Sequence, residues 1–315
     1  QVSSIKNKFK RAQVFAKQKA ERKKEKKDAK QMRDQEEAAL GSAAPPKPKP
    51  FTQDTLREWD DTVVDKDDPE IVADEASDEF ADLFSGDRAP KMMLTTKVRP
   101  SGKIFDVLKE LMTLFPSIYY YKRNNHPLKK ICRWAAKKDF THLVVVGEKA
   151  KKPNKMHIIK LPGGPTAYFK FTSWTSRKDI PGHGVPTGHD PEVILNRFDT
   201  RLGRRLSRMF GSMFPQKPEY HGRSVVTFHN QRDFVFVRHH RYIFESRDVR
   251  LPRLGLAAMS LTHTPSQKAR LQELGPRFTL KLKWLLADTF NTEEADYEWM
   301  HKGHSMDKTR RTFHL

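Results

Sequence analysis

Two segments of this chain share a pattern that constrains the fold more than any other feature. Each begins with Gly-Pro and then places apolar residues at every second position, over residues 164–171 and 275–282. This alternation is typical of a β-strand with one buried face. Since the two segments lie far apart in the sequence, the pattern predicts an internal duplication.

The residues around both segments predict alternating strands and helices. Apolar residues at helical spacing predict helices over 104–115, 126–138 and 200–214, with Ser101 as a cap for the first of them. Apolar runs predict strands over 91–96, 118–121, 141–146, 156–161, 224–228 and 234–244. The predicted fold class is α/β, with two similar halves, about 91–180 and about 185–315, packed into one domain with a cleft between them.

One connection departs from this regular pattern. Residues 248–274 form a long insertion with few aromatic residues. Because so long a loop in a compact domain is usually functional or disordered, we expect it to be largely mobile and dispensable for the fold.

Charge divides the chain into three blocks. Residues 1–50, a predicted basic helical arm and Pro-rich spacer, have 15 Lys and Arg against 6 Asp and Glu. Residues 51–90, an acidic linker, have 3 against 14, and residues 91–315 have 42 against 19. The basic excess of the last block predicts a polyanion partner, either nucleic acid or an acidic protein.

The acidic linker has two interpretations. Aliphatic and aromatic residues such as Ile71, Phe80 and Leu83 lie among its acids. This mixture suits a segment that docks on a basic surface of this chain or of a partner, and it equally suits a disordered linker.

Three basic surfaces are candidate RNA-binding sites. The predicted helix over 200–214 places four arginines at spacing i, i+3, i+4 and i+7, namely Arg201, Arg204, Arg205 and Arg208. No acid lies within this stripe, and its geometry suits phosphate contacts. The helix over 126–138 has a weaker version in Lys129, Lys130 and Arg133. The strand after the second Gly-Pro has Arg277, Lys281 and Lys283, with Arg238 and Arg241 on an earlier strand.

No motif predicts catalysis, a cofactor or a metal. The sequence lacks a P-loop, His-Glu-x-x-His and Gly-x-Ser-x-Gly. Its single cysteine, Cys132, lies on an apolar helix side and is predicted to be a core thiol. The histidines are scattered, and His239 and His240 are expected to be partly exposed strand residues. No apolar stretch predicts a membrane segment.

Several motifs together resemble a known family. The run LPGGPTAYF at 161–169 and the run GPRFTLKL at 275–282 resemble the two signature elements of Brix-domain proteins. Further segments, at 74–80, 227–233, 240–244, 297–299 and 310–315, resemble one branch of that family, which belongs to nucleolar precursors of the large ribosomal subunit.

The resemblance implies more than composition does. It implies a non-enzymatic ribosome assembly factor of the nucleolus, with two halves similar to an anticodon-binding fold. Its partners would be precursor large-subunit ribosomal RNA, pre-60S assembly factors including a dedicated non-Brix protein, and ribosomal proteins. It points to Arg277, Lys281 and Lys283 as RNA-facing residues. The alternative is a basic protein–protein scaffold in a nuclear complex, without direct RNA readout.

Overall fold

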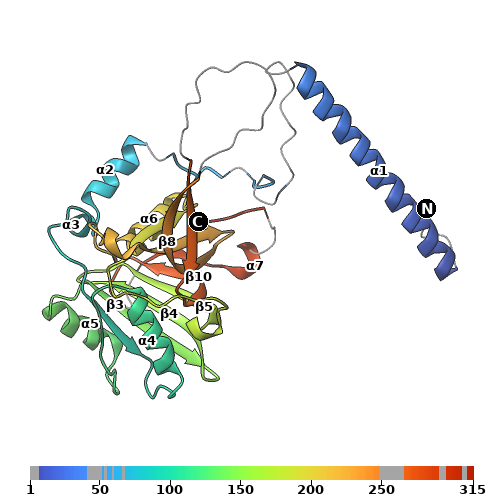
Figure 1. The fold of residues 1–315 in the computed structure, drawn as a ribbon. Helices are drawn as coiled ribbons and strands as arrows, with labels where there is room; N and C mark the ends of the chain where they lie inside the picture. The colour runs from blue at the N-terminus through green and yellow to red at the C-terminus, as the bar shows by residue number, and fades with distance from the viewer. Residues whose placement is uncertain are drawn as a thin grey trace, which may run out of the picture. The chain divides into compact units, whose positions relative to one another are not determined.

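The chain forms two units in the computed structural model (Figure 1). The structure describes residues 7–40, 52, 55–58, 60–65, 68–247, 266–290, 296–306 and 311–315. The first unit is Gln1–Leu56 and the second is Arg57–Leu315. The first contains the predicted polar helix, α1 (Lys8–Leu40), whose start is capped by the Asn7 side chain, which accepts a hydrogen bond from the Phe9 amide. The predicted Pro-rich spacer lies outside the described residues.

The second unit is a mixed α/β structure. Its helices are α2 (Pro69–Ser77), α3 (Ala81–Phe84), α4 (Ile104–Leu114), α5 (Leu128–Lys137), α6 (Arg201–Gly211) and α7 (Gly303–Met306). Its strands are β1 (Met92–Thr96), β2 (Ile118–Tyr120), β3 (His142–Lys149), β4 (Lys152–Lys160), β5 (Thr166–Thr175), β6 (Glu192–Asn196), β7 (Ser224–Gln231), β8 (Phe234–Arg247), β9 (Ser266–Glu273), β10 (Arg277–Leu286) and β11 (Tyr297–Met300).

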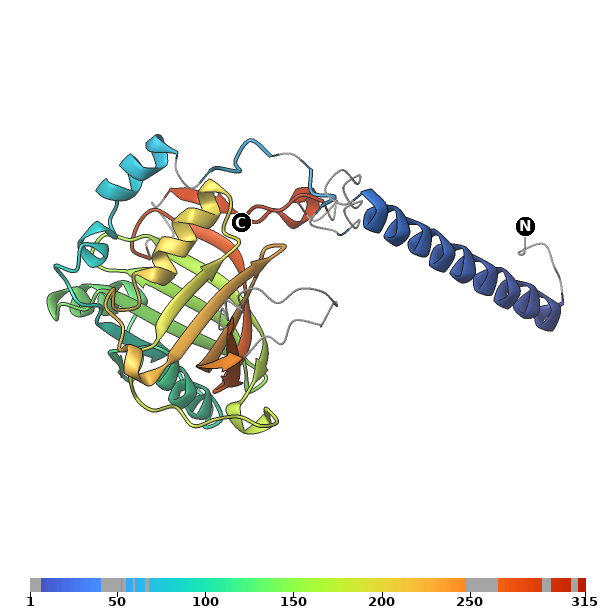
Figure 2. The ribbon, with the colours of Figure 1, turned by 45° about the horizontal axis from the view of Figure 1, so that its top comes forward.

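All these strands belong to one twisted sheet (Figure 2). Its order is β2-β1-β3-β4-β5-β10-β8-β7-β6, with β9 paired to β8 and β11 paired to β10. Each half contains a parallel pair, β1 with β3 in the first half and β6 with β7 in the second. In each half the second strand of that pair also pairs antiparallel with the next strand, β3 with β4 and β7 with β8. The predicted fold of two similar α/β halves is therefore confirmed. The duplicated segments became β5 and β10, which pair antiparallel, so the halves meet in one continuous sheet and not across the predicted cleft.

The sheet has two faces with different covers. Alternate residues of the strands, such as Val144 on β3 and Leu280 on β10, pack in a large core with the apolar sides of α4 and α6. We call this side the first face. Residues of opposite parity, such as Val145, pack under α5 in a smaller core that contains Cys132. On this second face α5 covers only part of the first half. Burial raises the pKa of the Cys132 thiol to about 11, as expected for a core residue.

The expectations for Ser101 and His239 were wrong, and the expectation for the 248–274 insertion is corrected only for its last residues. Ser101 does not cap α4, because its hydroxyl and amide donate hydrogen bonds to the buried carboxylate of Glu148. Part of the 248–274 insertion is a strand, since β9 pairs with β8 along its length and Leu274 after it is buried; residues 248–265 lie outside the described residues. His239 is buried, and its ring bonds Ser224 and the Gly275 carbonyl, while burial lowers its pKa to about 4.

Candidate nucleic-acid interface

Helix α6 forms as predicted and presents its arginines on one side. Thr200 caps it, because its hydroxyl accepts a hydrogen bond from the Gly203 amide. Leu206, Met209 and Phe210 are fully buried against the sheet. The arginines therefore lie on the opposite side, away from the sheet.

The acidic segment lies directly on these arginines. Arg201 pairs with Glu70 at 2.9 Å, and Arg204 pairs with Glu75 at 3.3 Å. Arg205 lies 2.7 Å from Glu79 and 2.6 Å from Glu298 of β11. Arg208 binds Asp78 through two nitrogens and lies 3.6 Å from Glu75. All four arginines of the stripe thus have carboxylate partners that come from other parts of the chain.

Apolar contacts fix the segment in the same place. Ile71, Phe80 and Leu83 are buried, and Phe80 belongs to the large core of the first face. The Arg208 guanidinium stacks 4.3 Å above the ring of Phe84. Burial lowers the pKa of Arg205, but its hydrogen bonds to Glu298 and Glu79 outweigh this and raise it. Residues 69–84 therefore dock on this chain's own basic surface, which decides between the two interpretations of the linker for this stretch.

The second face has a row of lysines. In the register of the sheet Lys155 of β4 lies opposite Lys170 of β5, and Lys170 lies opposite Lys281 of β10. Lys170 is exposed, and the other two are half-buried. We call these three residues the lysine row. Like charges directly opposite one another destabilise a sheet, so this row favours a bound anion.

Aromatic rings lie beside the lysine row on the same face. His157, Tyr168 and Trp284 are cross-strand neighbours two or three positions along the strands, with ring centroids 4.8 Å and 5.1 Å apart. Burial is the main reason that the pKa of His157 falls to about 4, so the ring is neutral at pH 7. Lysines interleaved with flat rings are the composition of surfaces that bind single-stranded nucleic acid.

The predicted residues of β10 and β8 are only partly brought together. Lys281 and Arg238 lie on the second face, where Lys281 is 5.1 Å from the Phe234 ring. Arg277 forms an ion pair with Glu273 at 2.6 Å, and Lys283 contacts His301 at 3.2 Å. Arg241 lies three residues from Arg238, so it points to the opposite face, where it donates to the Val185 carbonyl.

Helix α5 lies on the same side of the sheet as the lysine row. Its buried residues Leu128, Ile131, Cys132 and Ala135 face the strands. Its predicted basic residues Lys129, Lys130 and Arg133 are exposed, and the Lys130 ammonium lies 4.9 Å from the Trp134 ring. Two of the three predicted basic surfaces therefore share one side of the molecule.

Lys155 and Lys170 were missed by the sequence analysis. The duplication contained the signal for Lys170, because this residue follows Gly164 at the same distance as Lys281 follows Gly275. Lys155 belongs to β4, outside the duplicated segment, and only the register of the sheet places it beside Lys170.

Metal-binding clusters and membrane-spanning helices are absent from the part of the chain that the structure describes. Within them, no group of three or more His, Cys, Asp or Glu side chains could hold a metal ion. A search of the same residues finds no helix long and apolar enough to span a bilayer.

Comparisons with known proteins define the class. The Brix domain matches residues 98–284, so the chain belongs to the Brix-domain family. The chain is 45% identical over 315 residues to ribosome production factor 1 of Mus musculus, covering all of this chain and 85% of that protein. It is 37% identical to ribosome production factor 1 of Saccharomyces cerevisiae, covering 99% of this chain and 98% of that protein.

A solved structure is also similar. The crystal structure of a probable ribosomal biogenesis protein from Aeropyrum pernix K1 matches with a TM-score of 0.42 and 15% identity, over 61% of this chain and 96% of that one.

Proposed function

We propose that this protein is a non-enzymatic ribosome assembly factor that binds precursor ribosomal RNA during maturation of the large, 60S subunit. The names of its relatives support ribosome production, and the lysine row Lys155–Lys170–Lys281 supports RNA as the ligand. We also propose that the protein acts in the nucleolus, among pre-60S assembly factors, ribosomal proteins and a dedicated non-Brix protein partner, as its resemblance to the Brix-domain family implies.

The geometry of the lysine row suits a phosphate backbone. Neighbouring strands lie about 4.8 Å apart, so the three positions span roughly 10 Å across the sheet. The stem of Lys155 packs over Gly147 of β3, where a side chain at residue 147 would clash with it. Each phosphate that a lysine neutralises releases counterions, which stabilises the complex and makes its affinity salt-dependent. Arg238, Lys129, Lys130 and Arg133 lie on the same side and extend the surface.

The test is the salt dependence of RNA binding by the full chain. Lys155→Gln, Lys170→Gln and Lys281→Gln together should lower the slope of log affinity against log salt by about 2 units on single-stranded RNA, at roughly 0.7 per contact. The control replaces three exposed lysines on other elements with glutamine, Lys103, Lys109 and Lys217. It removes the same charge and should leave the slope within about 0.5 units.

The alternative function is a basic protein–protein scaffold without direct RNA readout. If both triple variants change the slope equally, the effect is one of net charge, and the lysine row is not the RNA site. If the unaltered chain binds RNA only weakly and without a salt slope, the scaffold is the better description.

A further inference from the structure

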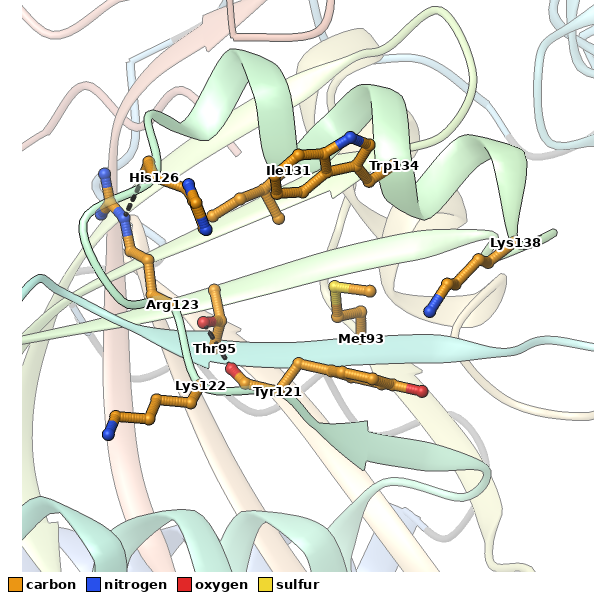
Figure 3. A pocket seen from close by; sticks show the side chains of 9 residues that line it. All are labelled: Met93, Thr95, Tyr121, Lys122, Arg123, His126, Ile131, Trp134 and Lys138. Carbon is orange, nitrogen blue, oxygen red and sulfur yellow. Dashed lines mark hydrogen bonds between the residues drawn. The ribbon is translucent and has the colours of Figure 1, made fainter.

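A hollow opens on the second face between α5 and the edge of the sheet (Figure 3). Its volume is about 360 Å³. Met93 of β1 and Ile131 of α5, both buried, lie at its base. Figure 3 shows Trp134 on the α5 side and Tyr121 across from it, with Met93 between them. The Trp134 and Tyr121 side chains are 40% and 42% exposed, so each ring has a surface that a ligand can reach.

The hollow exists because β2 is short. The strand ends at Tyr120, and the chain then turns away after the Tyr121 amide donates to the Leu94 carbonyl. The Thr95 hydroxyl donates to the Tyr121 carbonyl at 2.8 Å and holds this turn. The Nε of Arg123 donates to the His126 carbonyl and shapes the loop before α5. These bonds preorganise the site, so a ligand need not order it.

Its chemistry is aromatic and cationic. None of the nine lining residues is acidic, and Lys122, Arg123 and Lys138 are among them. The Lys138 ammonium lies 5.6 Å from the Tyr121 ring, and Lys130 lies beside Trp134. Flat rings bind other flat rings by stacking, and cations around them attract the phosphates on either side of a base.

The hollow lies on the same face of the sheet as the lysine row, because its lining residues Met93 and Ile131 belong to the small core under α5. A second hollow, of about 460 Å³, shares Lys122 and Arg123 with the first, and Lys97 and Arg99 also line it. Basic side chains thus continue from the first hollow into the second.

We propose that the hollow between Tyr121 and Trp134 holds one unstacked base of single-stranded RNA. The base stacks on these rings, and Lys122, Arg123 and Lys138 bind the adjoining phosphates. The proposal rests on the proposed function, since it assigns to the same RNA ligand a second point of contact. It also predicts a preference that the lysine row alone does not give, because a base inside a duplex cannot enter the hollow.

The experiment compares single-stranded with duplex RNA on the full chain. The probes are a 12-nucleotide RNA of mixed sequence and its duplex. Tyr121→Ala with Trp134→Ala should weaken binding of the single strand by roughly five- to 150-fold, as expected for a lost stacking contact. The salt slope and the duplex affinity should stay unchanged, because no charge is removed. Tyr220→Ala, which removes an even more exposed ring on another part of the surface, is the control and should have no effect.

Two further measurements keep the result decisive if the double variant folds poorly. Trp134→Phe keeps a ring and should keep most of the affinity. On the unaltered chain, photocrosslinking with 4-thiouridine in the single strand should attach it to Tyr121 or Trp134. Crosslinks only at other residues would overturn the proposal.

These experiments distinguish a failure of the base-binding proposal from a failure of the proposed function. If the lysine-row variant loses RNA and the aromatic variant does not, the hollow is not a base site, although the proposed function stands. Loss of single-strand and duplex binding in equal measure would also overturn it. If an acidic peptide containing phenylalanine binds the unaltered chain and not the aromatic variant, while RNA affinity is unchanged, the hollow belongs to a protein partner.

Discussion

The arginine stripe of α6 and the lysine row of the sheet look alike in composition and differ in their surroundings. The stripe lies under Glu70, Glu75, Asp78 and Glu79, which neutralise it. The row consists of three lysines that face one another across adjacent strands. The stripe therefore binds a segment of its own chain, whereas the row gathers three positive charges on the second face.

This difference teaches that spacing identifies a basic surface but not its ligand. The stripe has ideal helical periodicity, and no acid lies within it, so phosphate was a reasonable expectation. Its carboxylates come from about 130 residues earlier in the chain and, in Glu298, from 93 residues later. That α6 binds RNA phosphates stays an untested prediction, and its ion pairs favour another role, which is to hold the acidic segment on the first face.

The largest effect on stability is expected when the apolar anchor of the acidic segment, Phe80, is removed. Phe80 is fully buried in the core of the first face. Phe80→Ala should lower the free energy of unfolding by roughly 3–5 kcal/mol, as is usual for a buried phenylalanine. Urea denaturation checks this, with Val72→Ala, an exposed residue of α2, as the control. A change below 1 kcal/mol would mean that the segment is only loosely attached.

A double-mutant cycle on Arg208 and Asp78 measures how strongly the stripe and the acidic segment stabilise each other. Their side chains are only 14% and 12% exposed and share two hydrogen bonds. Arg208→Gln or Asp78→Asn should each cost roughly 1.5–3 kcal/mol of stability, because each removes the charge from one side of a largely buried, hydrogen-bonded pair. The double variant should cost much less than the sum. Additive losses would show that the two side chains do not stabilise each other.

The smallest effect is expected at the exposed end of the stripe. Arg201 and Glu70 are 54% and 65% exposed, and such surface pairs contribute at most about 1 kcal/mol. Arg201→Gln should therefore leave the melting temperature almost unchanged, and it should leave the salt slope of RNA binding unchanged as well. A fall of about 0.7 in that slope would show that Arg201 contacts an RNA phosphate and that the stripe belongs to the RNA-binding surface.

The sequence predicted those features that depend on local periodicity. The alternation in 275–282 correctly placed Phe278, Leu280 and Leu282 in the core and Lys281 on the other face. The apolar spacing in 200–214 correctly predicted which side of α6 is buried. In both cases one face of an element is buried in the core, so the pattern of a few residues is enough.

The features that the sequence missed depend on contacts between distant segments. Nothing local shows that Glu79 meets Arg205, or that Lys155 lies beside Lys170. Arg238 and Arg241 are close in sequence, yet strand geometry sends them to opposite faces. The strand β9 was missed because its residues are mostly polar and exposed, so its pairing with β8 has no apolar signature.

The pairing of β5 with β10 also bears on whether the protein or its ligand loses conformational entropy on binding. Eight residue pairs join the two halves, from Thr166 with Leu286 to Thr175 with Arg277. A hinge needs a few residues that can absorb large changes in φ and ψ, and these two strands stay paired on either side of their two register shifts. The two halves are therefore joined within one sheet, and the strand pairing sets the spacing of Lys155, Lys170 and Lys281. Under the proposed function the RNA is the partner that loses conformational freedom, so RNA strands already extended to match this spacing should bind more tightly than strands that must first be straightened.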